Sequence, residues 1–244
     1  MITLSRLDYS YPSGDDALSS VTWSVGDGAL VGLVGANGSG KSTLMAIVAG
    51  LYTPSNGSLA VGKLESPGNE KAIRSMCRLV MQDADLQILG ATVEEDLLLG
   101  RKHTDEAVAE AKTMAARFHL LESWEKPVHT LSWGMKRKLC LAAALLDEPQ
   151  VILLDEPFSG LDFPGMREMR RIIVENKKAG LTQIVSSHDL ESFVDIVDEL
   201  AVLDDGKLVL TGPPHSVLDH VLDHGVRPPC SWNSGLGVKA WDND

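Results

Sequence analysis

The chain has 244 residues, and its 34 acidic and 22 basic side chains give a net charge of −12. This acidic balance argues against a nucleic-acid partner, because non-specific binding to nucleic acid depends on a basic surface. Apolar runs fall short of the ~20 residues that a membrane helix needs, and the chain starts on an alternating strand rather than on a signal peptide. The cysteines Cys77, Cys140 and Cys230 show neither metal-site nor disulfide spacing. We therefore expect a soluble cytosolic chain with reduced thiols, of one domain or one domain with an insertion.

The N-terminal stretch is predicted to form an antiparallel β subdomain. Residues 2–11 and 17–25 alternate between apolar and polar side chains, and turn residues follow each stretch. Alternation over this length is typical of a strand with one buried face. We expect this patch to lead into a central sheet, whose first strand covers residues 29–34.

The next segment contains a phosphate-binding motif. Its residues are Gly35-Ala36-Asn37-Gly38-Ser39-Gly40-Lys41-Ser42-Thr43. They fit the pattern G-x-x-x-x-G-K-S/T between a strand and a helix. The glycines let the backbone N–H groups point into one concavity, to which the following helix adds its positive end. We expect Lys41 to contact the β- and γ-phosphates and Ser42 to ligate Mg²⁺. The alternative is a glycine-rich turn without a ligand.

The middle of the chain is predicted to be helical. Thr92 and Glu95 fit a capping box. Thr104 can cap a helix whose apolar residues share one face, and Ser132 is a suitable N-cap for the next helix. Residues 83–146 therefore read as an α-helical insertion between two α/β segments.

Polar side chains follow three of the apolar strands predicted for this chain. They are Gln82 after residues 78–81, Asp155 and Glu156 after residues 151–154, and His188 after residues 182–186. Ligands of open α/β sheets bind at the carboxyl ends of the strands, so we expect these side chains near the phosphate loop. Asp155 would then hold Mg²⁺, directly or through water, and Glu156 would orient or deprotonate an attacking water. An acidic N-cap pair before Pro157 is the alternative for the two carboxylates, and the glutamine and histidine are otherwise ordinary polar residues.

The C-terminal third is predicted to contain two further helices and a hairpin. Residues 190–197 and 215–224 are expected to be helical, and Asp204-Asp205-Gly206 is a hairpin turn. In the second helix His220 and His224 would share one face at a spacing of four residues, which can bind a divalent ion. The alternative is a polar surface helix, since two ligands do not complete a metal site.

These motifs, together with Leu131-Ser132-x-Gly134 and Ser159-Gly160-Leu161-Asp162, occur in the order seen in the ATP-binding subunits of ABC transporters. The chain resembles that family over about residues 1–228, which leaves residues 229–244 as a C-terminal tail. The resemblance implies an α/β P-loop NTPase fold with a parallel central sheet, an N-terminal antiparallel β subdomain and an inserted helical subdomain at about residues 83–146. It also implies ATP hydrolysis by a head-to-tail pair of subunits.

The same resemblance implies roles for single residues. It matches Tyr11 to the aromatic residue that stacks on adenine, whereas position alone makes Tyr11 a packing residue on a strand face. In the family pattern Lys41, Ser42 and Thr43 contact phosphate and Mg²⁺, Gln82 is the lid glutamine that also reaches the metal, Asp155 is the Mg²⁺ aspartate, and Glu156 is the catalytic base. His188 matches the switch histidine, and Asp162 an aspartate that crosses the dimer interface. Ser132 and Gly134 begin the helix that would contact the partner's ATP.

A narrower resemblance is to the energy-coupling-factor type, the ATPases of cobalt, nickel and vitamin uptake. It rests on Tyr9-Ser10-Tyr11-Pro12 and on residues 80–87, 92–96 and 225–229. It implies a subunit that powers a membrane importer for a transition-metal ion or a vitamin, from the cytoplasmic face of the membrane. The implied partners are a second ATP-binding subunit, identical or similar, a transmembrane coupling protein near residues 82–96, and a substrate-binding membrane protein. The alternatives are another type of ABC transporter and a soluble regulatory ATPase.

Two segments depart from the family pattern. The usual signature L-S-G-G-Q has Trp133 in place of a glycine and Met135 in place of the glutamine. Our hypothesis from the sequence is that the large ring makes the composite ATP site slower or asymmetric, so that Trp133→Gly would change the ATPase rate. In the lid segment Ala84 and Leu86 replace the usual proline and aspartate.

Overall fold

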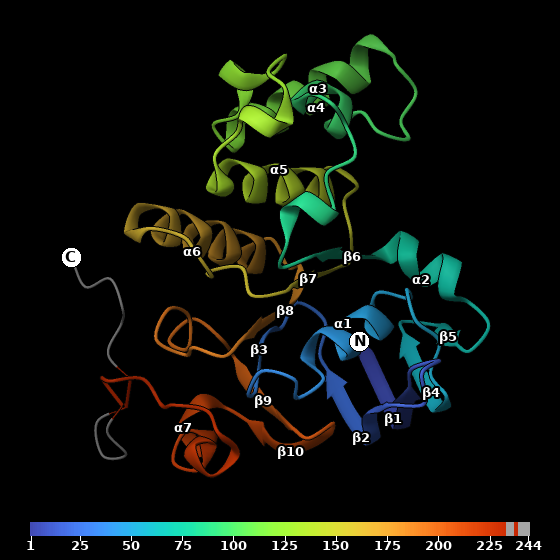
Figure 1. Ribbon diagram of the computed structural model, residues 1–244, viewed down its shortest axis with the longest axis vertical. Helices are drawn as coiled ribbons and strands as arrows, with labels where there is room; N and C mark the ends of the chain where they lie inside the picture. Colours follow the sequence, from blue (N-terminus) through green and yellow to red (C-terminus); the bar gives the residue numbers. More distant parts are fainter. Residues whose placement is uncertain (233–236, 239–244) are drawn as a thin grey trace.

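Two β-sheets organise the computed structural model, which describes residues 1–232 and 237–238 (Figure 1). The smaller sheet is antiparallel and has the strand order β2-β1-β4-β5. Its strands are β1 (Ile2–Ser10), β2 (Asp16–Val25), β4 (Asn56–Val61) and β5 (Leu64–Ser66). The predicted N-terminal antiparallel subdomain is therefore confirmed, with one later hairpin added to its edge.

The larger sheet has the order β10-β9-β3-β8-β7-β6. Its strands are β3 (Leu30–Val34), β6 (Cys77–Val80), β7 (Val151–Leu154), β8 (Thr182–Ser187), β9 (Glu199–Asp204) and β10 (Lys207–Gly212). Every pair is parallel except the β9–β10 hairpin. All residues of β3, β7 and β8 are buried, as expected for strands that are covered on both faces. The predicted parallel central sheet is confirmed.

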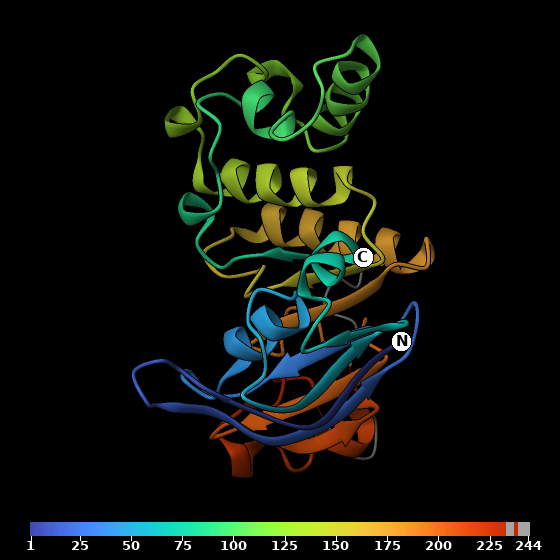
Figure 2. The same cartoon turned by 90° about the vertical axis from the view of Figure 1, so that its right-hand side faces the viewer.

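Helices cover the larger sheet and extend beyond it. The helices are α1 (Lys41–Val48), α2 (Glu70–Met76), α3 (Val93–Leu97), α4 (Asp105–Arg117), α5 (Trp133–Leu146), α6 (Phe163–Lys178) and α7 (Pro214–Val217), with short 3-10 turns at Ala84–Leu86, Leu121–Ser123, Val128–Thr130 and Val221–His224. Figures 1 and 2 show α3 and α4 stacked over α5, and α5 contacts β6 at the edge of the sheet. None of the helices in the described part of the chain is both long and apolar enough to cross a membrane.

The predicted N-caps are present at three of these helices. Thr92, Thr104 and Ser132 each accept a hydrogen bond from the backbone N–H three residues on. Each cap stabilises its helix by about 1 kcal/mol, because it satisfies an N–H that has no partner within the helix. The capping box differs in one bond, since the Glu95 carboxylate accepts from the N–H of Ala91 rather than from that of Thr92.

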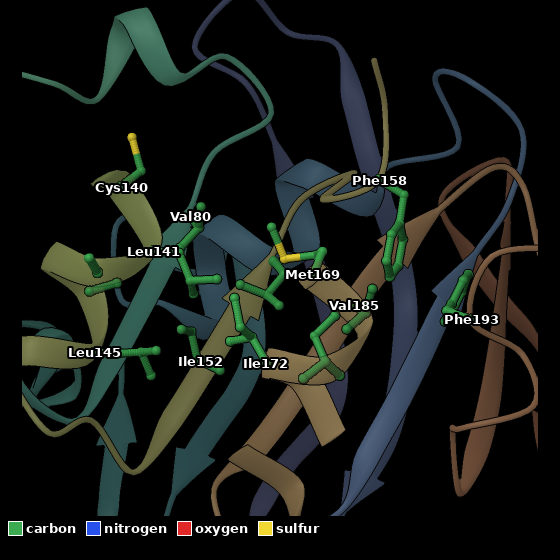
Figure 3. Packing of buried hydrophobic residues seen from close by; sticks show 14 of the residues in the cluster. Val80, Cys140, Leu141, Leu145, Ile152, Phe158, Met169, Ile172, Val185 and Phe193 are labelled. Carbon is green, nitrogen blue, oxygen red and sulfur yellow. The ribbon is translucent and has the colours of Figure 1, made fainter. Parts of the chain in front are cut away.

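Two hydrophobic clusters cover the two faces of the larger sheet. Val151 and Leu153 belong to the cluster shared with α1 and the antiparallel sheet, and Ile152 and Leu154 belong to the cluster under α5 and α6. Figure 3 shows side chains of α5 and α6 meeting β7 and β8 in this second cluster. Successive residues of β7 thus pack on opposite faces, which explains why this strand has no polar alternation.

The two helices predicted for the C-terminal third do not form as predicted. Residues 190–197 form a series of turns, because Arg170 of α6 takes the carbonyl oxygen of Ser192 and the carboxylate of Asp195 as its acceptors. The segment keeps one α-helical bond, from the N–H of Val194 to the carbonyl oxygen of Leu190. Ile196 donates to Phe193 rather than to Ser192, whose carbonyl oxygen accepts from Arg170. Residues 215–224 divide into α7 and a 3-10 turn at Val221–His224.

The hypothesis that His220 and His224 bind a metal ion is wrong as well, because it needed both residues on one continuous helix. His220 and His224 do not share one helix, and His224 instead makes a 2.9 Å hydrogen bond through Nδ1 to the carboxylate of Asp204. Within the described ranges, no group of three or more His, Cys, Asp or Glu side chains is placed to hold a metal ion. Part of the predicted tail, residues 233–236 and 239–244, lies outside the described residues.

Thiol labelling should separate the three cysteines. Burial raises the pKa of Cys77 and of Cys140 to about 12, whereas Cys230 is exposed. Only a thiolate reacts quickly with disulfide reagents such as Ellman's reagent. We expect rapid labelling of Cys230 alone in the native protein near pH 8 and of all three thiols in denaturant. Rapid labelling of a second thiol in the native protein, or of none, would contradict this packing.

Candidate functional site

The carboxyl ends of β3, β6, β7 and β8 meet at one cavity of about 620 Å³. Its lining comes from the phosphate loop, from the strand ends, from the turn before β2 with the start of that strand, and from the turn between β9 and β10. The lining residues are Tyr11, Asp15, Asp16, Ala17, Asn37, Gly38, Gly40, Lys41, Ser42, Thr43, Gln82, Asp155, Glu156, His188, Asp205 and Gly206. The structure thus brings together the phosphate loop and all four polar residues that the sequence placed at strand ends.

The phosphate loop joins β3 to α1 and packs closely on β9. Gly38 and Gly40 have φ of +81° and +101°, values that favour glycine. At Gly35 the constraint is space, because an added Cβ would lie 2.2 Å from the carbonyl oxygen of Leu203 and 2.6 Å from Ser39 Oγ. The loop therefore needs these glycines for two different reasons, backbone conformation and close approach.

Two polar groups of the loop are suited to receive an anion. The ammonium of Lys41 is buried and donates to the carbonyl oxygens of Gly35 at 2.8 Å and Ala36 at 3.0 Å. Burial lowers its pKa, although the carboxylates of Glu156 and Asp155 act in the opposite direction. The hydroxyl of Ser39 is buried and has no hydrogen-bond partner among the described residues. A bound phosphate would give both groups a charged partner.

Asp155 follows β7 directly and is almost fully buried. The hydroxyl of Ser186 on β8 donates to Asp155 Oδ1 and accepts from the backbone N–H of Glu156 at 3.0 Å. This serine was not identified from the sequence, where its only signal is a hydroxyl within an apolar strand. It holds the two acidic residues in register with β8.

The oxygen-bearing side chains of the cavity fit Mg²⁺. Ser42, Gln82 and Asp155 offer a hydroxyl, an amide and a carboxylate, and all three line the same cavity. Mg²⁺ is usually held by one or two carboxylates together with phosphate oxygens and water. This donor set suits an ion that arrives with a nucleotide rather than a protein-only metal site.

Glu156 and His188 form a hydrogen-bonded pair at the edge of the cavity. Glu156 Oε1 lies 2.9 Å from His188 Nδ1, and the glutamate is buried while the imidazole is half-exposed. The backbone of Glu156 has φ of +48°, an uncommon conformation for a residue with a Cβ. Such strain costs about 1–3 kcal/mol and is found most often at functional sites. Its consequence here is that the side chain leaves the line of β7 toward the cavity.

Tyr11 packs on neighbouring rings and also lies beside the phosphate loop. Its hydroxyl is 2.6 Å from Thr43 Oγ1, which ties it to the phosphate loop, and its ring lines the cavity. The ring also packs edge-on against Tyr9, with centroids 5.2 Å apart. It packs in the same way against Tyr52, with centroids 6.3 Å apart, and 36% of the residue is exposed.

The residues that the resemblance assigns to the dimer interface lie in a different cavity. Ser132, Gly134 and Asp162 line a smaller cavity of about 240 Å³ between the starts of α5 and α6. Ser132 caps α5, and Asp162 Oδ1 caps α6 by accepting from the N–H of Gly165 at 2.9 Å. None of the three lines the cavity of the phosphate loop. They are not brought to it within one chain.

The C-terminal segment contacts the site from outside, which the sequence did not indicate. Gly225 lies against the phosphate loop, where a Cβ would be 3.7 Å from the Cβ of Ala36. Arg227 forms an isolated β-bridge with Asp189, the residue after His188. The segment thus touches both the phosphate loop and the loop of the histidine.

A phosphate loop that ends a buried strand, an aspartate at the end of another strand and a glutamate–histidine pair around one cavity define a phosphate-loop nucleotide-binding ATPase. Comparison with known proteins narrows this class. The family model described as ABC transporter matches residues 18–159. A second model, for an AAA domain, matches the shorter stretch 125–195.

Two curated relatives match nearly the whole chain. The "Cobalt import ATP-binding protein CbiO" of Rhodobacter capsulatus is 32% identical over 239 residues, which cover 94% of this chain and 85% of the relative. The "Energy-coupling factor transporter ATP-binding protein EcfA" of Carboxydothermus hydrogenoformans is 32% identical over 235 residues, which cover 93% and 87%. The chain belongs to the ATP-binding subunits of ABC transporters, and it is an ATPase.

Solved structures agree with this assignment. The structure of cbiO1 from Clostridium perfringens, described as part of the ABC transporter complex cbiONQ, has a TM-score of 0.79 and 30% identity, covering 90% of this chain and 91% of that one. The ATP-binding cassette MJ0796, a dimer bound to ADP and Pi, has a TM-score of 0.80 at 22% identity, covering 88% and 99%. The second likeness shows the fold, and the predicted fold class is thereby confirmed.

The affinity for ATP should fall at alkaline pH through Lys41. Burial lowers the pKa of the free lysine, and a bound phosphate favours the ammonium, so binding raises that pKa again. Between the two pKa values the complex holds a proton that the free protein has lost. Affinity therefore falls as pH rises through this window, and below it the lysine adds no pH dependence. Calorimetric titrations with a non-hydrolysable ATP analogue from about pH 7 upward would measure this slope.

The matched variant for this titration is Lys41→Arg. A guanidinium stays charged across the whole range, so the variant should bind more weakly but without the alkaline slope. An equal slope in both proteins would show that a different group titrates.

Proposed function

We propose that this chain is the ATP-hydrolysing subunit of an energy-coupling-factor type importer, for a transition-metal ion such as cobalt or nickel or for a vitamin. The relatives support the transporter type, since CbiO is named for cobalt import and EcfA for an energy-coupling factor. We further propose an ABC domain over residues 1–228 with its helical insertion at about residues 83–146, followed by a tail at 229–244. The alternatives are another type of ABC transporter and a soluble regulatory ATPase.

The observation that carries the proposal is the Glu156–His188 pair beside the phosphate loop. Glu156 is poised to orient a water molecule or take its proton for in-line attack on the γ-phosphate, and His188 holds the carboxylate at 2.9 Å. The loop N–H groups and Lys41 would hold the β- and γ-phosphates. Mg²⁺ bound near Ser42, Gln82 and Asp155 would neutralise charge on the phosphates as it develops. The ring of Tyr11 would pack against the adenine of ATP.

The signature residues support a composite site shared by two chains. Ser132, Gly134 and Asp162 line a cavity different from that of Lys41, so one chain does not bring both sets to one ATP. Head-to-tail pairing with an identical or similar subunit would place the start of α5 against the partner's nucleotide. The N-terminal end of that helix then adds donors and a positive dipole to the γ-phosphate.

The surface beside Gln82 supports a membrane partner. Apolar side chains are exposed there, although large apolar residues are ordinarily buried. They are Met81, Leu86, Leu89 and Leu99, which are 39%, 69%, 75% and 56% exposed. We propose that the transmembrane coupling protein docks on residues 82–96, at the cytoplasmic face of the membrane. The lid glutamine at the start of this segment would relay docking to the ATP site.

The experiment that tests the proposal is purification of the tagged chain from its native membranes in mild detergent, with mass spectrometry of the proteins that accompany it. A polytopic scaffold protein together with a small substrate-binding membrane protein would support the energy-coupling-factor type and indicate the cargo. Two ordinary permease subunits would support another ABC transporter type. Recovery from the soluble fraction without a membrane protein would overturn the importer proposal in favour of a regulatory ATPase.

A further inference from the structure

The large ring of Trp133 has partners within its own chain. Trp133 is the first residue of α5, and 39% of it is exposed. One face of the indole lies over the guanidinium of Arg137, one turn further along the helix, with 4.1 Å from Cζ to the ring centroid. The ring also touches Gly160, where an added Cβ would lie 3.2 Å from it. The indole is thus packed in place rather than free in solvent.

Arg137 connects two loops of the ATP cavity. Its side chain is buried, with Nη1 donating to the carbonyl oxygen of Glu156 and Nη2 to that of Gln82 at 2.9 Å. Gln82 follows β6 and Glu156 follows β7, so one planar guanidinium spans the ends of two neighbouring strands. Because the fork of an arginine is rigid, it sets the distance between these two backbone positions. Both side chains line the cavity of the phosphate loop.

The buried charge of Arg137 needs stabilising partners. Burial lowers the pKa of Arg137 to about 10, and its Nε has no hydrogen-bond partner among the described residues. Neutral carbonyl groups satisfy only part of a buried cation. A tryptophan face is the strongest aromatic partner for a guanidinium, and the attraction increases where water is excluded.

We propose that Trp133 is a positioning residue for ATP hydrolysis, which holds Arg137 so that Gln82 and Glu156 keep their relative places. The inference rests on the proposed roles of these two residues. Trp133 adjoins Ser132, which would contact the partner's nucleotide, so the same ring links the helix start at one composite site to the glutamate of the other. A ring that only obstructs the partner's phosphate would have the opposite effect. Removal of the π-face speeds the reaction if the ring obstructs, and slows it if the ring positions Arg137.

The test is a comparison of kcat and of KM for ATP in the full-length chain. Trp133→Leu keeps an apolar side chain but loses the π-face, and we expect kcat to fall about tenfold with KM changed by less than about twofold. Trp133→Phe keeps an aromatic face and should retain kcat within about threefold of the wild type. Arg137→Lys keeps the charge but loses the fork, and should lower kcat at least as much as the leucine variant. The double variant Trp133→Leu with Arg137→Lys should be no slower than the slower of these two single variants, because both changes act through one contact.

Lys112→Ala is the matched control, because Lys112 lies over the ring of Trp124 in a cation–π pair outside the ATP cavity. Its kcat should equal that of the wild type. Leucine and phenylalanine variants with equal rates, or a faster leucine variant, would overturn the proposal and leave obstruction as the role of the ring. If the leucine variant does not fold, as judged by thermal unfolding, the ratio of phenylalanine to Arg137→Lys rates decides instead. Absence of ATPase activity already in the wild type would count against the proposed function rather than against Trp133.

Discussion

Replacing Glu156 by glutamine is expected to lower the rate of ATP hydrolysis by about 10²–10⁴-fold while ATP binding persists, since this is the usual contribution of a general base. The amide has almost the shape of the carboxylate, so the cavity and its phosphate-binding groups stay as they are. It can still bond to Nδ1 of His188, which lies 2.9 Å from Glu156 Oε1. What is lost is the ability to accept a proton from water.

The structure explains why another acid should not replace Glu156. Asp155 is next in sequence, but its Oδ1 accepts from Ser186 and its side chain lines the cavity as a metal ligand would. Both side chains line the same cavity, and Glu156 reaches it from a left-handed backbone with φ of +48°. The variant should therefore bind ATP and fail to turn it over, which favours an ATP-bound dimer.

Steady-state phosphate release and binding of a fluorescent ATP analogue measure the two effects separately. Glu148→Gln is a matched control, because Glu148 also has φ of +48° but lies before β7, at the opposite end of the strand from the cavity. Its turnover should equal that of the wild type. Turnover that survives in Glu156→Gln would remove this residue as the base. A joint loss of binding and turnover would instead show a structural role.

Much of the site could be predicted because its parts are local in sequence. The phosphate loop is one continuous motif, and Asp155 and Glu156 directly follow an apolar run that is too short for a helix. A parallel sheet then brings the carboxyl ends of its strands to one edge without any further information. The order of strands in the sheet, with β3 between β8 and β9, places Lys41 and His188 together although they are far apart in the chain.

The parts that were missed depend on contacts between distant segments. No sequence pattern singled out Arg137, and only the fold shows its fork between Gln82 and Glu156. Arg170 likewise donates to the carbonyl oxygen of Ser192 and to the carboxylate of Asp195, within the segment 190–197 that was predicted to be a helix. Local periodicity does not contain such information, because a buried arginine competes with backbone hydrogen bonds only after the elements have packed.

A methyl group at Gly35 should impair ATP binding more than a methyl group at Gly38 of the same loop. In Gly35→Ala the new Cβ would lie 2.2 Å from the carbonyl oxygen of Leu203, a backbone atom of β9 that cannot rotate away. The loop must then move off the sheet, which also moves the carbonyl that holds the ammonium of Lys41 at 2.8 Å. Overpacking of this kind costs about 1–3 kcal/mol, so we expect ATP affinity to fall by about 10–100-fold.

Two alanine variants separate this steric effect from the other effects of losing a glycine. Gly26→Ala places the methyl group in open space before β3, the strand that leads into the phosphate loop, and its affinity should match that of the wild type. Gly38→Ala also meets no atom within 4 Å but has φ of +81°, so it carries only the conformational cost of about 1–2 kcal/mol. Titration with a fluorescent nucleotide, alongside thermal unfolding, measures both quantities. Binding by Gly35→Ala that is as tight as that of Gly26→Ala would mean that the loop does not need its contact with β9 to cradle phosphate.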